Sequence, residues 1–123
     1  MHNKTYVKVV KRNTDQILIE SARWCESRLC RLIGLQFRRG LKSGDALILV
    51  MPRESVSLTS IHMFFVFFSI AAVWVNDKGQ VTSTQLAKPW RPYYASPTPA
   101  RYVIETTSDF LKQISVGDEV DFV

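Results

Sequence analysis

Few side chains in this sequence have the type and spacing that catalysis requires. His62 stands at the start of a long apolar run, where an imidazole can serve as a general base. Ser60 lies two residues earlier, but no G-x-S-x-G elbow surrounds it to present a nucleophile. The alternative is a histidine at the core edge whose ring is satisfied by the backbone. We therefore assign no catalytic residue and expect a non-catalytic binding or accessory domain rather than an enzyme, which would have His62 as its acid–base group.

The acidic residues do not gather at the spacing of a metal site. Asp118, Glu119 and Asp121 are neighbours, but strand alternation would place Glu119 on the opposite face from the other two. A solvated strand end explains this group better. No glycine-rich phosphate loop is present either. We expect neither a bound metal nor a cofactor.

A basic patch is the first candidate binding surface. Residues 1–53 hold eleven basic and four acidic side chains, against five and seven in residues 54–123, and the net charge is +5. Such a surface is typical of weak, salt-sensitive binding to nucleic acids or other anions. No standard nucleic-acid recognition motif is present. Arg31 and Arg38 would serve equally well in ion pairs with Glu105 or other acids that hold the helix and loop on the barrel. The candidate anion-binding residues are Arg31, Arg38, Arg39 and Lys42.

An aromatic, proline-rich loop is the second candidate. Residues 88–100 contain four prolines, which exclude a helix or a central strand. Exposed Trp and Tyr beside Arg are typical of interface centres, so the loop predicts a small-molecule or protein partner. The alternative is that Trp90 plugs one end of a barrel. The candidate ligand- or partner-binding residues are His62, Phe65, Trp90, Arg91 and Tyr93.

The elements that must position these residues are mostly strands. The apolar run Ile61–Val75 is too short for a membrane helix, which needs about 20 apolar residues, so it must be buried. Ser21 is predicted to cap a main helix whose inward residues are Cys25, Leu29, Leu32 and Ile33. The predicted strands are 6–12, 16–20, 46–51 (ended by Pro52), 70–75, 80–86, 101–105 and 119–123, with a short helix over 109–114. Closely spaced strands joined by turns predict a mainly β, antiparallel barrel or sandwich with a helix on one side.

Length and cysteine usage set the broader class. The 123 residues, 46% hydrophobic, fit one domain over residues 1–123. On the predicted helix Cys25 and Cys30 would lie about 140° apart, so we expect two reduced thiols, with Cys25 buried. Met1–Thr5 lacks the apolar core of a signal peptide, although a chain that had lost its leader would look the same. We expect a cytoplasmic protein.

Six motifs in register resemble one prokaryotic family. The segment Arg28–Leu41 resembles its R-x-x-G-L-x-x-R-x-x-L pattern, and His62–Val75 resembles its H-T-F-F-M-R-F-P-I-D-V-V-F-L-D pattern. The remaining motifs are Asp77–Val81, Pro89–Arg91, Ala100–Glu105 and Ile114–Asp118. Together they cover residues 24–122, and the family is domain of unknown function 192.

The resemblance implies a compact β-barrel or sandwich of jelly-roll type with a helix packed on it, and it implies no function. The central motif departs from the family pattern. Val66, Phe67, Ser69 and Ala71 stand where the family has Met, a basic residue, Pro and an acid. If the family motif held a carboxylate and a cation in one site, this chain has lost both groups.

Overall fold

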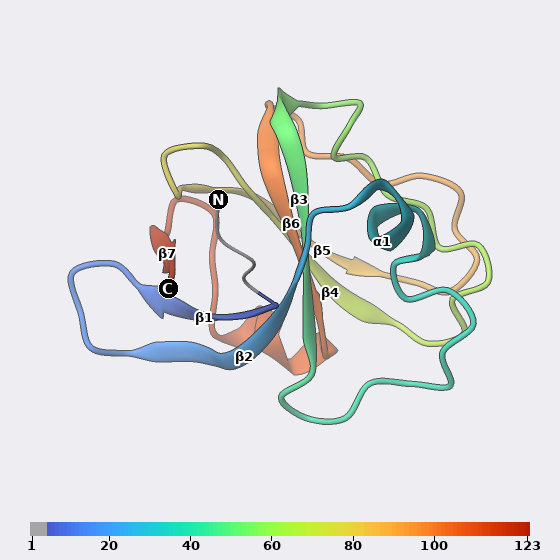
Figure 1. Cartoon of the computed structure of the whole chain (residues 1–123), viewed down its shortest axis with the longest axis horizontal. Helices are drawn as coiled ribbons and strands as arrows, with labels where there is room; N and C mark the ends of the chain where they lie inside the picture. The colour runs from blue at the N-terminus through green and yellow to red at the C-terminus, as the bar shows by residue number, and fades with distance from the viewer. Residues whose placement is uncertain (1–4) are drawn as a thin grey trace.

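The computed structural model describes residues 5–123, so His2 lies outside the described part of the chain. Seven strands form one sheet in the order β5-β4-β6-β3-β2-β1-β7 (Figure 1). The elements are β1 (Tyr6–Lys11), β2 (Ile17–Cys25), α1 (Arg28–Ile33), β3 (Ala46–Ser55), β4 (Ile70–Val75), β5 (Val81–Ala87), β6 (Ala100–Thr106), the 3₁₀ helix η1 (Ser108–Lys112) and β7 (Val120–Phe122).

The sheet curls into a half-barrel. Every strand pair is antiparallel except β2 and β3, which run parallel, so the expectation of an entirely antiparallel sheet is wrong at this one pair. A backbone bridge between Gln80 and Glu119 brings the start of β5 to the start of β7, the two ends of the strand order. The predicted mainly β architecture is thus confirmed.

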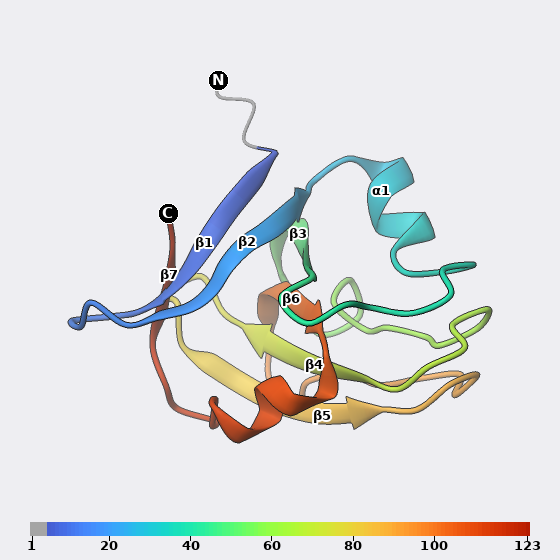
Figure 2. The same cartoon turned by 90° about the horizontal axis from the view of Figure 1, so that it is seen from below.

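Both faces of the central strands are buried. All six residues of β4 are buried, as a continuous apolar run predicts for a strand covered on two sides. One face joins a core with Val9, Val73 and Ile104 that η1 closes with Phe110. The other face carries Trp74 and Val103 in a second core, next to α1 and the segment 61–66. Figure 2 shows α1 and η1 on different sides of the sheet.

The predicted main helix is largely wrong. Residues 22–25 are extended in β2, and the helix is a short one, α1, whose N-cap is Ser27 rather than Ser21. None of its residues is buried, and Leu29, Leu32 and Ile33 are exposed instead of facing inward. The reason is that parallel pairing with β3 holds the chain extended through Cys25. Strand β3 also continues past Pro52, which sits in an irregular stretch of the pairing with β6.

The expectation of two reduced thiols is also wrong. Cys25 and Cys30 form a disulfide with their Cα atoms 5.5 Å apart. Because Cys25 ends a strand and Cys30 lies on α1, the 140° separation of a single helix does not apply. Cys25 is fully buried, as expected. The disulfide fastens the short helix to the end of β2.

Gly79 lies where the turn after β4 meets β7. Its φ is 82°, and a Cβ there would collide with the guanidinium of Arg12 and the carbonyl oxygen of Val120. That guanidinium is held in place because Nη1 donates to the Lys78 carbonyl at 2.8 Å and Nη2 to the Asp121 carboxylate at 2.9 Å. Gly117 has a similar φ of 95°, but open space surrounds the position of its Cβ. A side chain at Gly79 would therefore meet both backbone strain and a steric collision, whereas one at Gly117 would meet backbone strain alone.

We expect Gly79→Ala to lower the free energy of unfolding by about 3 kcal/mol, because a backbone penalty and overpacking add. Gly117→Ala should lower it by about 1 kcal/mol, since only the backbone penalty applies. Chemical denaturation of both variants measures the difference. Equal losses would show that the contact between Arg12 and the turn does not constrain the fold.

Candidate functional site

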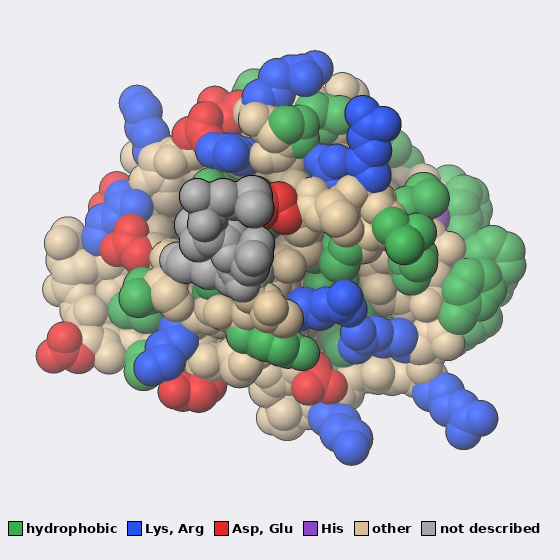
Figure 3. Space-filling model, viewed as in Figure 1, with side chains coloured by type: hydrophobic (Ala, Val, Ile, Leu, Met, Phe, Trp, Pro, Cys, Tyr) green, Lys and Arg blue, Asp and Glu red, His purple; other side chains and the backbone are tan. Residues whose placement is uncertain are grey.

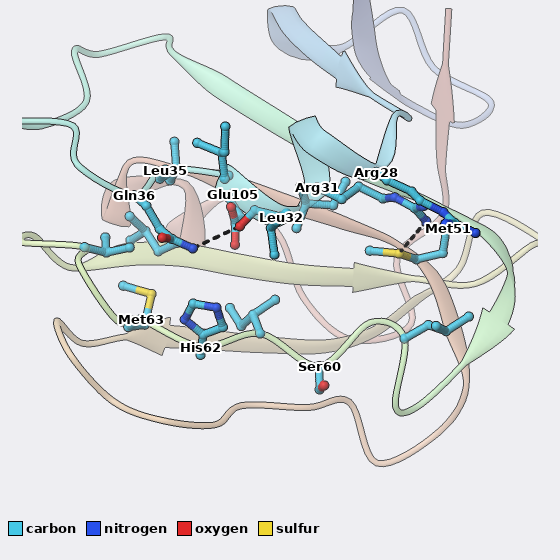
Figure 4. Close-up of a pocket in the computed structure, with 17 residues that line it drawn as sticks. Arg28, Arg31, Leu32, Leu35, Gln36, Met51, Ser60, His62, Met63 and Glu105 are labelled. Carbon is cyan, nitrogen blue, oxygen red and sulfur yellow. Dashed lines mark hydrogen bonds between the residues drawn. The ribbon is translucent and has the colours of Figure 1, made fainter.

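The principal cavity lies between α1 and the segment 58–66, on the face of the sheet opposite η1 (Figure 4). Its volume is about 310 Å³, at the small end of ligand pockets. Leu49, Ile70 and Glu105 supply the floor from three different strands. The walls are mainly apolar, from Met51, Ile61, Met63 and Val66, while Arg28, Arg31, Gln36 and His62 add polar groups.

Glu105 is the unusual residue of this cavity. Its position on β6, between Leu47 of β3 and Ala72 of β4, places it in the middle of the sheet. Only 5% of the residue is exposed, and burial raises the pKa of its carboxyl to about 7. No hydrogen bond or ion pair within residues 5–123 engages the carboxyl. The carboxyl oxygens are not among the fully buried unpartnered atoms of the described chain, so the group faces the cavity and is available to a ligand.

Arg31 brings a second unpartnered group to the same cavity. Its Nη1 donates to the sulfur of Met51 at 3.4 Å, while its Nε is buried without a partner. The predicted ion pair between Arg31 and Glu105 is therefore absent from the described structure. Gly34 ends α1 beside both residues, and a Cβ on it would lie 3.9 Å from Glu105 Oε1 and 4.0 Å from the Arg31 carbonyl oxygen. Arg31 and Glu105 both line the cavity, the Arg31 Nε is buried without a partner, and no hydrogen bond within residues 5–123 engages the Glu105 carboxyl.

His62 lines the cavity from the opposite side to α1. Its Nδ1 accepts a hydrogen bond from the Phe64 backbone N–H at 3.2 Å, and the two rings lie 5.2 Å apart. This matches the alternative of a histidine satisfied by the backbone, although the ring is exposed rather than at a core edge. No side-chain hydrogen bond joins His62 to Ser60, whose hydroxyl instead donates to the Ser57 carbonyl at 2.7 Å.

The other predicted ligand-binding residues lie outside the cavity. Phe65 and Trp90 contact each other with ring centroids 5.1 Å apart, and both are nearly half exposed. Trp90 therefore does not plug the barrel. The Arg91 carbonyl accepts from the Met63 backbone N–H at 2.7 Å, which ties this loop to the central segment, and Tyr93 is exposed. The structure brings Phe65 and Trp90 together on a surface next to the cavity.

The predicted basic patch is divided. Arg31 turns toward Met51 in the cavity, whereas Arg38, Arg39 and Lys42 are absent from its lining and are exposed. No ion pair among residues 5–123 engages the four basic residues. Nor do three or more His, Cys, Asp or Glu side chains of the described chain gather so that they could hold a metal ion.

Sequence reasoning missed Glu105 as a binding group. The sequence signal is an acidic residue directly after the apolar pair Val103 and Ile104, and the same position equally predicts an internal partner for arginine. Of the substituted family positions, Val66 lines the cavity. Ala71 is buried in the core on the η1 side, and Phe67 is exposed beside Trp90, so neither lines the cavity.

We expect the stability of the protein to fall as the pH rises from 5 to 8. The folded pKa of Glu105 lies above the unfolded value of 4.5, so the folded state binds more protons in this window and loses them as the pH passes about 7. The loss should reach about 3 kcal/mol. Glu105→Gln should abolish this slope, as measured by denaturation at several pH values, and the exposed Glu20→Gln should keep it. An unchanged slope in Glu105→Gln would contradict the assignment.

Comparisons with known proteins agree with the fold. The fold matches that of a "putative transcription regulator" from Sinorhizobium meliloti with a TM-score of 0.81, at 16% identity over 95% of this chain and 92% of that one. A protein of unknown function from Novosphingobium aromaticivorans gives 0.79, at 17% identity over 94% and 83%. At these identities the likeness concerns the fold alone.

Sequence relatives carry no functional name. The UPF0127 protein of Pyrococcus furiosus is 31% identical over 87% of this chain and 90% of its own length. That of Thermococcus sibiricus is 34% identical over 63% of this chain, and the match spans only about half of its length (51%). The family model described as "DUF192: Uncharacterized ACR" matches residues 8–122. The chain belongs to the DUF192 family.

Proposed function

We propose that the protein is a non-catalytic binding domain that holds a small zwitterion with an apolar body, such as an apolar amino acid. The observation that carries this proposal is the presence of two unpartnered groups of opposite character in one apolar cavity. A ligand ammonium would supply the missing partner of the Glu105 carboxyl. A ligand carboxylate would accept from the free Nε of Arg31.

The rest of the cavity supports the same chemistry. Leu49, Met63 and Ile70 offer an apolar surface to a hydrocarbon side chain, and about 310 Å³ admits only a small molecule. Gly34 leaves the space beside Glu105 free of a side chain. Ser60, His62 and Glu105 also line this space, but within residues 5–123 no hydrogen bond joins their side chains to one another, which favours binding over reaction.

Leucine and two of its fragments test the proposal. Isoamylamine lacks the carboxylate and 4-methylpentanoate lacks the ammonium, while both keep the same hydrocarbon body. We expect leucine, methionine or phenylalanine to raise the melting temperature, and each fragment to bind at least tenfold more weakly than leucine. Because the ammonium needs an ionised Glu105, affinity should rise about tenfold from pH 6 to pH 8.

Matched variants assign the contacts. Glu105→Gln should lose the preference for leucine over 4-methylpentanoate, and Arg31→Met should lose the preference for leucine over isoamylamine. Glu20→Gln, which changes an exposed carboxylate outside the cavity, serves as the control. The proposal is wrong if no apolar amino acid binds, or if Glu105→Gln and Arg31→Met bind leucine as the unaltered protein does.

Nucleic-acid binding and the cellular location are separate predictions from the amino-acid site. Binding of nucleic acid through Arg38, Arg39 and Lys42 stays a prediction, and a structural neighbour at 16% identity lends it no residue-level support. Within residues 5–123, no helix is long and apolar enough to cross a membrane. A cytoplasmic location also stays a prediction, and the Cys25–Cys30 disulfide argues against it because such bonds persist mainly in oxidising compartments.

A further inference from the structure

Four aromatic side chains form a continuous exposed cluster at the end of the molecule that carries α1. Phe37 stacks on Phe65 with ring centroids 4.9 Å apart, and Trp90 contacts both Phe65 at 5.1 Å and Phe67 at 5.7 Å. Their exposed fractions are 68% for Phe37, 44% for Phe65, 53% for Phe67 and 47% for Trp90. Figure 3 shows a large hydrophobic area at this end. A cluster of this size on a surface marks a site of interaction.

The backbone holds this aromatic cluster outward at a conformational cost. Phe37, Phe65 and Trp90 all have φ near +60°, a region that bulky side chains rarely adopt. Hydrogen bonds fix the arrangement, because the Phe37 N–H donates to the Phe65 carbonyl at 2.9 Å and the Trp90 N–H to the Met63 carbonyl at 2.8 Å. Strain of this kind persists where the rest of the structure enforces it and is concentrated at functional sites.

Helix α1 extends the apolar surface. It buries none of its residues, and Leu29, Leu32 and Ile33 are all exposed. Leu32 and Ile33 also line the cavity, so the apolar surface continues to the mouth of the pocket. The disulfide between Cys25 and Cys30 fixes this helix to the sheet.

The charge around the aromatic cluster has one sign. The three segments that build this end are residues 27–44, 55–70 and 88–99, and together they contain seven Lys and Arg and no Asp or Glu. The remainder of the chain has nine basic and eleven acidic residues. These three segments therefore have a net charge of +7, and the remainder of the chain, which includes the cavity residue Glu105 and the adjoining Glu26, Asp45 and Glu54, has −2. Figure 3 shows Lys and Arg side chains on both sides of the hydrophobic area.

We propose that this end of the molecule docks on an anionic lipid bilayer. The aromatic cluster and α1 would enter the interface between head groups and acyl chains, where Trp and Phe are favoured. The surrounding Lys and Arg would contact acidic head groups, each adding electrostatic attraction. An acidic protein surface could also pair with these Lys and Arg side chains, but the exposed Trp and Phe cluster favours the bilayer interface as the occupant.

Sedimentation with vesicles of phosphatidylcholine, with and without phosphatidylglycerol, tests the proposal. We expect the protein to bind only vesicles that contain phosphatidylglycerol, with affinity that falls as salt is added. Phe37→Asn and Phe65→Asn should each weaken binding at least fivefold. Since Asn tolerates φ near +60°, these variants should melt at the same or a higher temperature, which separates lost docking from lost folding.

Two further variants complete the test. Val116→Ser removes an exposed apolar side chain in the turn before β7, at the end opposite α1, and should bind as the unaltered protein does. Arg38→Glu combined with Arg39→Glu should abolish binding. The proposal is overturned if neither vesicle binds, if both bind equally, or if the two Asn variants bind fully. Binding of a single-stranded oligonucleotide without binding of vesicles would overturn it in favour of a nucleic-acid surface.

Discussion

The structure depends on the need to cover both faces of three central strands. Strands β3, β4 and β6 are apolar on both sides, and β4 has no exposed residue. One face is closed by β1, β7 and η1, while the other receives only one short helix and irregular segments. Irregular chain carries backbone groups that must be paired, so these segments bond to one another, as Ile61 does with Tyr94. The cavity and the aromatic cluster are both made of this covering layer.

The covering layer also explains the state of Glu105. A carboxyl at the centre of a sheet face is removed from water once α1 and the segment 58–66 lie over it. Gly34 ends α1 beside this carboxyl, and the disulfide keeps α1 in place. The cost of desolvation appears as a pKa near 7. Within the described chain no ion pair offsets this desolvation cost. A buried ionisable group with a shifted pKa and no ion-pair partner is typical of a ligand-binding site.

Much of the fold could be predicted from the sequence, because burial follows local patterns there. The alternation in β1, the continuous apolar run of β4 and the turn at residues 76–79 predicted those strands correctly, whereas only residues 17–20 of β2 (Ile17–Cys25) were predicted as strand. The prediction of the main helix was wrong although Cys25, Leu29, Leu32 and Ile33 have helical spacing. Long-range pairing of β2 with β3 holds Cys25 in a strand. The prediction of the cavity residues was incomplete for a similar reason. Nothing local reveals that Glu105 lies beneath α1, or that Trp90 turns outward onto Phe65.

The most direct test is an NMR titration of the Glu105 side-chain carboxyl carbon, without ligand and then with saturating leucine. The site described here predicts a midpoint near pH 7 in the free protein, because the carboxyl is buried without a partner. With leucine bound the midpoint should fall by at least one pH unit, since the ligand ammonium stabilises the ionised form. A midpoint near the ordinary value of 4.5 in the free protein, unchanged by leucine, would contradict both the buried carboxyl and its role in binding.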